Sequence, residues 1–199
     1  MKILILIIST IFILFLILQS FTIMSTKKTE LQKYSVVHSE DEFEIRFYPS
    51  ATFATIKSEA KTYGELSGPG FRKLAGYIFG GNESETKISM TSPVQMDIND
   101  SVSEMSFVMP SEYKAENLPK PKDSGVIIHK TQDEYVAAVR FSGFSSDHAI
   151  LQHSEKLKAL LDKKGIVYSG NFRFLGYNPP WQLVGRRNEI IVSVKWEDK

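Results

Sequence analysis

The sequence predicts an α+β domain in which one sheet, or a distorted antiparallel β-barrel, carries two main helices. Three observations lead to this prediction. Apolar and polar residues alternate in several short runs, which is typical of half-buried strands. Apolar residues recur at spacings of three and four in two longer runs, which is typical of amphipathic helices. The order strand–helix–strand–strand occurs twice along the chain.

The N-terminal segment is the most apolar part of the chain. Residues 3–24 carry no charged side chain and are mostly Ile, Leu and Phe, and roughly 20 such residues suffice for a helix to cross a bilayer. The length favours an uncleaved anchor, while a cleaved export signal remains the alternative, with Ser20 and Thr22 as a poor small-residue cleavage pair. We therefore expect a protein that is membrane-anchored by residues 3–24, or exported if that segment is removed. Lysines flank both ends, so orientation stays open.

The rest of the chain divides into a short linker and one domain. We expect residues 1–24 to be the signal or anchor segment, residues 25–33 a polar linker, and residues 34–199 a domain long enough to bury a core. Without Lys2 the chain has 23 basic and 23 acidic residues, which argues against a nucleic-acid partner. Cysteine is absent from the sequence, which excludes disulfides and thiolate metal sites.

Local patterns place the elements of the domain. The predicted helices are residues 71–79, after a break at the glycines and proline of residues 64–70, and residues 148–164, which Ser145, Ser146 or Asp147 caps and Gly165 ends. The predicted strands, in chain order, are residues 43–48, 51–58, 87–91, 105–109, 135–141, 172–175 and 190–196.

The repeated order predicts a pseudo-twofold domain. The two sets are offset by about 80–87 residues. One set consists of Ala51–Ser58, Phe71–Phe79, Met90–Val94 and Met105–Met109, and the other of Tyr135–Ser142, Ile150–Leu161, Tyr177–Trp181 and Ile190–Val194.

Signatures of catalysis and of metal binding are missing from the sequence. His148 and His153 lie five apart on a predicted helix, about 140° around its axis, so they do not form a zinc-ligand pair. The serine of a G-x-S-x-G elbow does not occur, and the glycines of residues 64–70 lack the Lys-Ser/Thr of a phosphate loop. We therefore expect no catalytic residue, no metal ligand and no enzyme activity.

The first predicted helix carries an apolar face with basic neighbours. Methionines follow it in the chain, and methionine suits surfaces that accept flat apolar ligands. An apolar surface with basic residues at its edge fits a flat apolar ligand that carries carboxylates. The structural alternative is that this helix face is an ordinary part of the core. The candidate ligand-binding residues are Phe71, Arg72, Lys73, Leu74, Ala75, Ile78, Met90 and Arg186.

Several longer motifs run in one order over residues 34–196. They are Phe43-Glu-Ile-Arg-Phe-Tyr48, Gly70-Phe-Arg-Lys-Leu-Ala-Gly-Tyr-Ile-Phe-Gly-Gly-Asn82, Lys87-Ile-Ser-Met-Thr-Ser-Pro-Val94, Phe107-Val-Met-Pro110, Phe141-Ser-Gly-Phe144, Gly176-Tyr-Asn-Pro-Pro-Trp181 and Arg186-Arg-Asn-Glu-Ile190. With these motifs the chain resembles the SOUL haem-binding protein family. The resemblance implies a distorted antiparallel β-barrel with two main helices, built from two pseudo-twofold repeats.

The resemblance also implies a function. It implies non-enzymatic binding of haem or another tetrapyrrole in a shallow apolar groove at the first helix, as a carrier, buffer or scavenger. Relatives often carry a lysine where this chain has Gly76, and some carry a histidine, considered as an iron ligand, where this chain has Phe47. We therefore expect haem to bind without a protein axial ligand, with a different axial ligand as the alternative, and we expect metal-free porphyrins to bind as well.

The expected affinity is modest. Burying about 300 Å² of apolar porphyrin at ~25 cal/mol per Å² gives about 7 kcal/mol before association costs, which corresponds to micromolar binding. Two other functions remain open: an enzyme acting on a tetrapyrrole, and a binding module for another apolar ligand or a protein partner. The sequence does not predict the oligomeric state.

Overall fold

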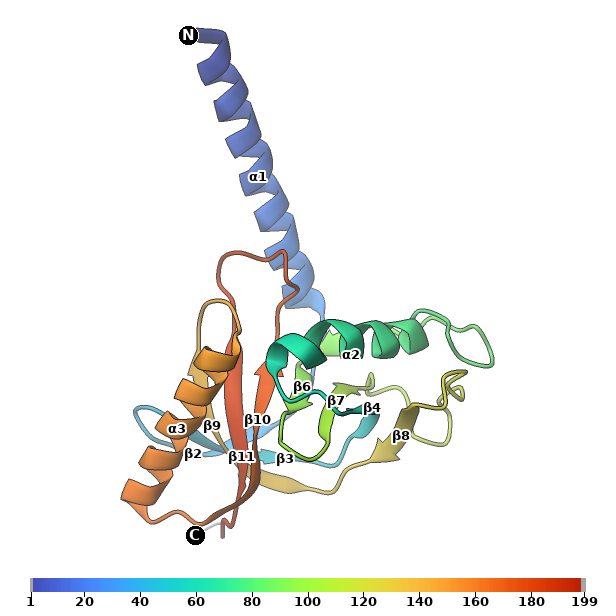
Figure 1. Ribbon diagram of the computed structural model, residues 1–199, viewed down its shortest axis with the longest axis vertical. Coiled ribbons are helices and arrows are strands. Elements are labelled where there is room, and N and C mark those ends of the chain that lie inside the picture. Colours follow the sequence, from blue (N-terminus) through green and yellow to red (C-terminus); the bar gives the residue numbers. More distant parts are fainter. Residues whose placement is uncertain (1, 198–199) are drawn as a thin grey trace.

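A computed structural model of the protein describes residues 2–197. Figure 1 shows a sheet-based domain from which one long helix projects. The helices are α1 (Lys2–Lys28), α2 (Tyr63–Ile78) and α3 (Asp147–Lys164). The strands are β1 (Glu30–Leu31), β2 (Ser35–Ser39), β3 (Glu44–Tyr48), β4 (Thr52–Ser58), β5 (Thr91–Ser92), β6 (Val94–Asp97), β7 (Ser103–Val108), β8 (Val126–Lys130), β9 (Glu134–Phe141), β10 (Tyr168–Gly176) and β11 (Asn188–Val194).

Nine strands form one sheet in the order β2-β3-β9-β11-β10-β6-β7-β4-β8, and each pairing in it is antiparallel. The short strands β1 and β5 pair separately and in parallel. The α+β class with a large antiparallel sheet is thus confirmed. The pairings among residues 2–197 form an open sheet that ends at β2 and β8 rather than a closed barrel. The sequence patterns missed both of these outer strands.

The strand order is mirrored about its centre. β7 lies between β6 and β4, as β11 lies between β10 and β9, and β6 pairs with β10 at the midline, with Met96 opposite Phe174. The predicted repeat of two superposable halves stays a prediction. One of its members was wrong, because residues 177–181 follow β10 as a loop. Pro179 and Pro180 in that loop lack the N–H groups that a strand ladder needs.

The helix α2 begins at Tyr63, eight residues before the predicted start. Thr62 caps it by accepting a hydrogen bond from the Glu65 amide at 3.2 Å, and the Glu65 carboxylate accepts one from the Lys61 amide at 2.8 Å. These two hydrogen bonds stabilise the start of the helix, and the helix forms although its glycines disfavour it. The predicted break at residues 64–70 was therefore wrong.

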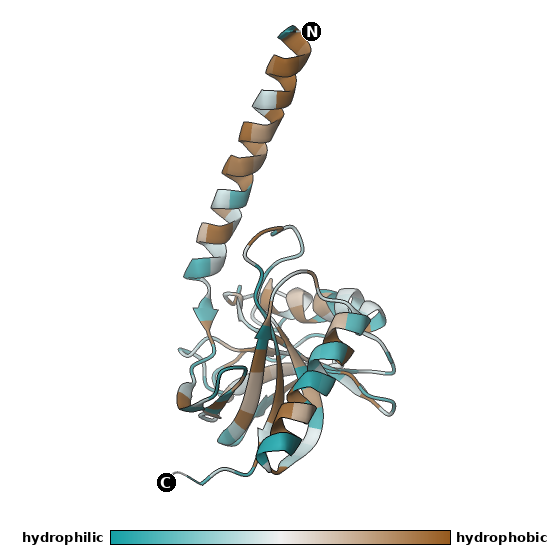
Figure 2. Cartoon of the chain, turned by 90° about the vertical axis from the view of Figure 1, so that its left-hand side faces the viewer, coloured by the Kyte–Doolittle hydropathy of each residue, from teal (hydrophilic) through white to brown (hydrophobic). Residues whose placement is uncertain are grey.

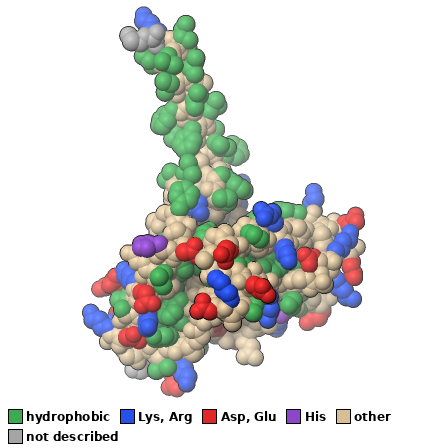
Figure 3. All heavy atoms as spheres, in the orientation of Figure 1, with side chains coloured by type: hydrophobic (Ala, Val, Ile, Leu, Met, Phe, Trp, Pro, Cys, Tyr) green, Lys and Arg blue, Asp and Glu red, His purple; other side chains and the backbone are tan. Residues whose placement is uncertain are grey.

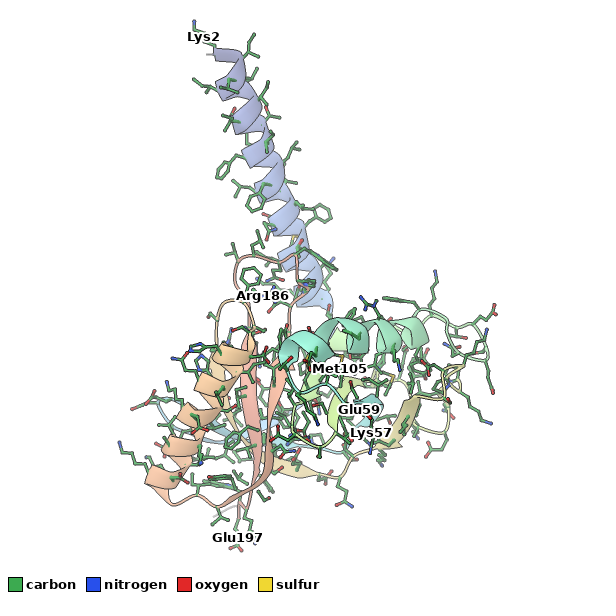
Figure 4. All side chains as sticks on the ribbon, viewed as in Figure 1. Lys2, Lys57, Glu59, Met105, Arg186 and Glu197 are labelled. Atoms are coloured by element: carbon green, nitrogen blue, oxygen red, sulfur yellow. The ribbon has the colours of Figure 1, made fainter. Side chains whose placement is uncertain are left out.

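One glycine in this first half of α2 has a packing role. A Cβ atom on Gly70 would lie only 3.1 Å from Cε of Met105, a fully buried residue of β7. Glycine therefore lets the helix approach the sheet closely, and Figure 4 shows Met105 beneath α2.

The helix α3 matches the sequence prediction closely. The Ser146 hydroxyl accepts a hydrogen bond from the Ala149 amide, and Gly165 ends the helix with a φ of 66°, in the left-handed region that favours glycine. Its Leu157 and Leu161 are fully buried.

The two domain helices share one core on one face of the sheet. α2 contacts β4, β7 and β8, whereas α3 contacts β9, β10 and β11, and their buried side chains belong to a single hydrophobic cluster. Met96, Met105 and Met109 are buried in or beside this cluster. Met96 and Met105 therefore fill the core rather than line a ligand surface.

The helix α1 projects from the domain and consists mostly of hydrophobic residues (Figure 2). Its apolar side chains are exposed along most of its length (Figure 3). It is long and apolar enough to cross a membrane, a property that signal sequences share. The helix continues to Lys28 into the segment predicted as a linker. Glu30 and Leu31 then pair with Thr91 and Ser92 as β1 and β5.

Candidate functional site

The predicted ligand face of α2 divides into a buried part and an accessible part. Leu74 and Ile78 are 0% and 1% exposed and belong to the hydrophobic core. Ala75 is 8% exposed and lies at the edge of the buried face. Leu74 and Ile78 therefore hold the helix on the sheet, and in this structure they offer almost no surface to a ligand.

The accessible part is a row of three residues at four-residue spacing, Phe71, Ala75 and Phe79, which we call the α2 row. Phe71 is 39% exposed and its ring contacts the ring of Phe107 on β7, with centroids 5.3 Å apart. Phe79 is 61% exposed at the C-terminal end of the helix. The predicted site omitted Phe79, although its spacing from Ala75 was a usable signal.

The two basic residues of α2 lie on different sides of it. Successive helical residues are about 100° apart, so Arg72 lies about 60° from the centre of the α2 row and Lys73 about 160°. The Lys73 ammonium lies close to Gly125, just before the outer strand β8. Both residues are exposed. Arg72 is therefore the cation that can meet a carboxylate of a ligand on the row.

Met90 and Arg186 complete the predicted set. Met90 is half-buried against the core, in the segment that follows the hydrogen bond from the Ile88 amide to the Ile78 carbonyl at 2.8 Å. Arg186 lies in the loop after β10, and its guanidinium donates to the carbonyls of Pro179 at 2.8 Å and Gln182 at 2.7 Å. Burial lowers the pKa of Arg186. Its Nη1 hydrogen bonds hold the loop, its buried Nε has no hydrogen-bond partner, and at 8% exposure the side chain offers little surface to a ligand.

A large cleft lies elsewhere. It has a volume of about 670 Å³ and opens between β1 and the loop after β7, and this size is typical of small-molecule sites. Apolar groups of Val108, Met109 and Tyr113 share the lining with Lys33 and Lys114, and no predicted site residue contributes. Sequence patterns could not reveal it, because segments distant in the chain form it.

Family motifs meet in a buried ionic network. Glu189 is fully buried, and its carboxylate accepts hydrogen bonds from Arg46 at 2.7 Å, from Arg187 at 2.9 Å and from the Tyr177 hydroxyl at 2.8 Å. Burial alone would raise the pKa of Glu189, but the hydrogen bond and charge of Arg46, together with Arg187, hold that pKa below its ordinary value. Burial raises the pKa of Tyr177. The network therefore keeps a carboxylate between two guanidinium groups.

The same motifs fix two neighbouring loops. The Asn178 side-chain oxygen accepts a hydrogen bond from the Arg187 amide at 2.6 Å. The Asn188 side chain donates to the Gly143 carbonyl at 2.8 Å and accepts from the Ser145 hydroxyl at 3.1 Å. These motif residues therefore hold the scaffold.

The residues relevant to iron ligation are the histidines and Phe47, which stands where some relatives carry a histidine. Phe47 lies on β3, near the opposite end of the sheet from the strands under α2, and its ring packs against Tyr135. His153 on α3 stacks on Phe141 with ring centroids 4.0 Å apart, and burial lowers its pKa. Among residues 2–197, no cluster of three His, Cys, Asp or Glu side chains is arranged to hold a metal ion.

Comparison with known proteins identifies the family. The model of the SOUL heme-binding protein family matches residues 29–193. The chain belongs to this family. It is 33% identical over 163 residues to heme-binding protein 2 of Mus musculus, covering 78% of this chain and 79% of that protein. It is 29% identical over 155 residues to heme-binding protein 1 of Xenopus laevis, covering 74% and 81%.

Solved structures show the same fold at low identity. The C-terminal domain of EcmrR has a TM-score of 0.58 at 10% identity, covering 82% of this chain and 99% of that one. A hydrolase from Listeria innocua has a TM-score of 0.55 at 9% identity, covering 77% and 92%. These likenesses concern the fold alone.

Proposed function

We propose that this protein binds haem or a related tetrapyrrole without transforming it, as a carrier, buffer or scavenger. The single observation that supports this most is its membership of the SOUL heme-binding protein family, with relatives that are themselves named heme-binding proteins. Haem binding is what these names say of the relatives, and its transfer to this chain is the proposal.

The binding surface we propose is the α2 row with Arg72 beside it. Phe71 and Phe79 are both accessible and offer rings to a flat apolar ligand, and Arg72 can pair with a carboxylate. Leu74 and Ile78 support this surface from below, as parts of the core. Such a surface binds by apolar burial and charge, so metal-free porphyrins should bind as well as haem.

Iron ligation by a histidine has little geometric support. The four histidines lie on β2, on β8 and, for two of them, on α3. His129 on β8 is within 2.9 Å of the Thr55 hydroxyl, with which it can share a hydrogen bond. We therefore keep the expectation of binding without a protein axial ligand, and of micromolar affinity.

A membrane tether is the second part of the proposal. The helix α1 has the length and apolar surface that a bilayer-spanning helix needs. It would hold the binding domain close to a bilayer, where apolar porphyrins partition. The alternative of an exported protein would require removal of this helix.

A haemin titration tests the binding proposal. The full chain is reconstituted in lipid nanodiscs, and haemin and metal-free protoporphyrin are titrated separately, with empty nanodiscs as the blank. We expect saturable spectral shifts for both ligands with dissociation constants on the order of micromolar. Absence of a saturable shift beyond that of empty nanodiscs would contradict the proposal.

The cleft beside β1 is the competing location for the ligand. Its lysines could also meet carboxylates, so the titration includes Lys33→Glu as a variant of the cleft. If Lys33→Glu weakens haemin binding while Arg72→Glu does not, the ligand lies in the cleft and not on the α2 row.

A further inference from the structure

The loop between β10 and β11 exposes large apolar side chains at its end. Trp181 and Val184 are 65% and 61% exposed, and Leu183 is 45% exposed. Phe144, which is 58% exposed, joins them because the Arg186 guanidinium lies 4.7 Å above its ring. We call the four residues Phe144, Trp181, Leu183 and Val184 the apolar tip.

The apolar tip lies directly beside α1. The Gln19 side-chain amide donates to the Trp181 carbonyl at 3.1 Å and its oxygen accepts from the Leu183 amide at 3.0 Å. Gln19 is 7% exposed. The loop backbone thus satisfies both ends of a polar side chain that would otherwise be unpaired in an apolar helix. Figure 4 shows Arg186 next to the lower end of α1.

A second polar contact extends the attachment toward the end of the helix. The Thr26 hydroxyl donates to the side-chain oxygen of Gln182 at 2.8 Å, and the Gln182 amide group donates to the Val184 carbonyl at 3.0 Å. Gln182 is buried. The loop is therefore attached to α1 at two levels, seven residues apart.

The position of Gln19 gives the depth of the tip. Gln19 precedes Met24, the last apolar residue before the polar end of α1, by five residues, which is about 7–8 Å along a helix. If the apolar run of residues 3–24 spans the hydrocarbon core, the loop reaches into the boundary between headgroups and acyl chains. This is the depth at which interfacial apolar side chains are buried.

We propose that the apolar tip inserts into the membrane interface beside α1 and makes a second contact of the domain with the bilayer. The inference rests on the proposed tether. The partner is a lipid surface, because the tip continues the apolar surface of α1 and carries an indole, the side chain that is enriched at such interfaces. Lys27 and Lys28 at the foot of α1 lie where headgroup phosphates are expected.

Two contacts would fix the orientation of the domain. A single helix followed by a flexible linker would let the domain swing and rotate. The hydrogen bonds of Gln19 and Thr26 instead join the loop to the helix. The domain is therefore held in one orientation on the membrane, with the loop after β10 facing the lipid.

Tryptophan quenching by lipid tests the inference. The chain has two tryptophans, so Trp196→Phe leaves Trp181 as the single reporter and Trp181→Phe leaves Trp196. Each full-length variant is reconstituted into phosphatidylcholine–phosphatidylglycerol vesicles, with and without bromine near the top of the acyl chains. We expect roughly twofold quenching of Trp181. Trp196, which follows β11 and packs against His38, should not be quenched.

A change in the docking residue provides the second variant. Gln19→Leu, combined with Trp196→Phe, keeps α1 apolar and removes both hydrogen bonds to the loop. We expect these chains to float with the vesicles as before, with weaker quenching of Trp181. Quenching that Gln19→Leu leaves unchanged would contradict the docking geometry.

The remaining outcomes separate this inference from the proposed function. Chains that fail to float with vesicles contradict the tether, and the inference falls with it. Chains that float while Trp181 stays unquenched contradict the inference alone, and a concentration-dependent blue shift would then assign the tip to a second copy of the chain. Haemin affinity, measured on the same vesicles, stays independent of both results.

Discussion

The buried network around Glu189 and the α2 row differ in what their side chains contact. In the network, Arg46, Arg187 and Tyr177 each donate a hydrogen bond to the Glu189 carboxylate. In the α2 row, Phe71 and Phe79 keep accessible rings. The motifs around Glu189 therefore hold the scaffold, whereas the motif at residues 70–82 supplies the accessible side chains of the proposed ligand surface. Stability and binding should respond to different substitutions.

The largest effect is expected from Glu189→Gln. This change removes the Glu189 carboxylate from the buried Arg46 and the half-buried Arg187, and breaking a buried ion pair typically costs about 3–5 kcal/mol. Urea unfolding of the full chain in detergent micelles, followed by circular dichroism, measures the free energy of unfolding. Glu85→Gln is the matched control, because its pair with Lys122 is exposed. An equal loss of unfolding free energy in both variants would show that the buried network stabilises the fold no more than an exposed ion pair does.

A smaller effect is expected from Arg72→Ala on haemin binding. Loss of one exposed charge-assisted contact should weaken binding by roughly threefold to tenfold. Lys73→Ala should have little effect, because this side chain lies toward Gly125 on the other side of α2. Titrations of both variants in nanodiscs decide this, and a larger effect of Lys73→Ala would place the ligand on the β8 side of the helix.

A gain of affinity is expected from Gly76→Lys. A Cβ atom at Gly76 meets no atom within 4 Å, so the side chain fits on the helix surface. The new cation lies beside the α2 row and should tighten haemin binding by about twofold to fivefold. Gly76→Ala is the control, since it brings the same gain in helix propensity without the charge. Equal haemin affinities of Gly76→Lys and Gly76→Ala would show that a basic contact at this position does not contribute to binding.

The smallest effect concerns pH and His153. Burial lowers the pKa of His153 below its ordinary value of 6.5, so the unfolded chain takes up a proton before the folded chain does. Stability is therefore present above pH 6.5 and declines as the pH falls toward the folded pKa. We expect the thermal midpoint to fall more between about pH 7.5 and 5.5 in the unmodified chain than in His153→Gln. Equal decreases of the thermal midpoint in both proteins would show that His153 does not contribute to this pH dependence.

Local signals predicted those parts of the fold whose causes are local. The helix α3 was predictable because Ser146 and Gly165 mark its two ends. The start of α2 was not, because Thr62 and Glu65 accept hydrogen bonds that stabilise a helix start within a glycine-rich sequence. The outer strands β2 and β8 were missed because they are short and largely exposed.

The candidate site was predicted only as a helix face. Periodicity found the face that holds Phe71 and Leu74, but spacing alone cannot tell which of them the sheet covers. The interpretation of the methionines failed in the same way, because Met105 packs beneath Gly70. The contact between Gln19 and the loop could not be predicted from local patterns, because Gln19 and Trp181 are 162 positions apart in the chain.

The most direct test of separate scaffold and ligand surfaces is the haemin affinity of Phe79→Glu. Its side chain is 61% exposed, so folding should be unaffected, while lost apolar contact and repulsion of ligand carboxylates should weaken binding about tenfold. Val167→Glu is the control, because Val167 is similarly exposed at the far end of β10 from the loop. A tenfold loss in Phe79→Glu alone, with unchanged unfolding, is the predicted result. Equal haemin affinities in both variants would contradict the account.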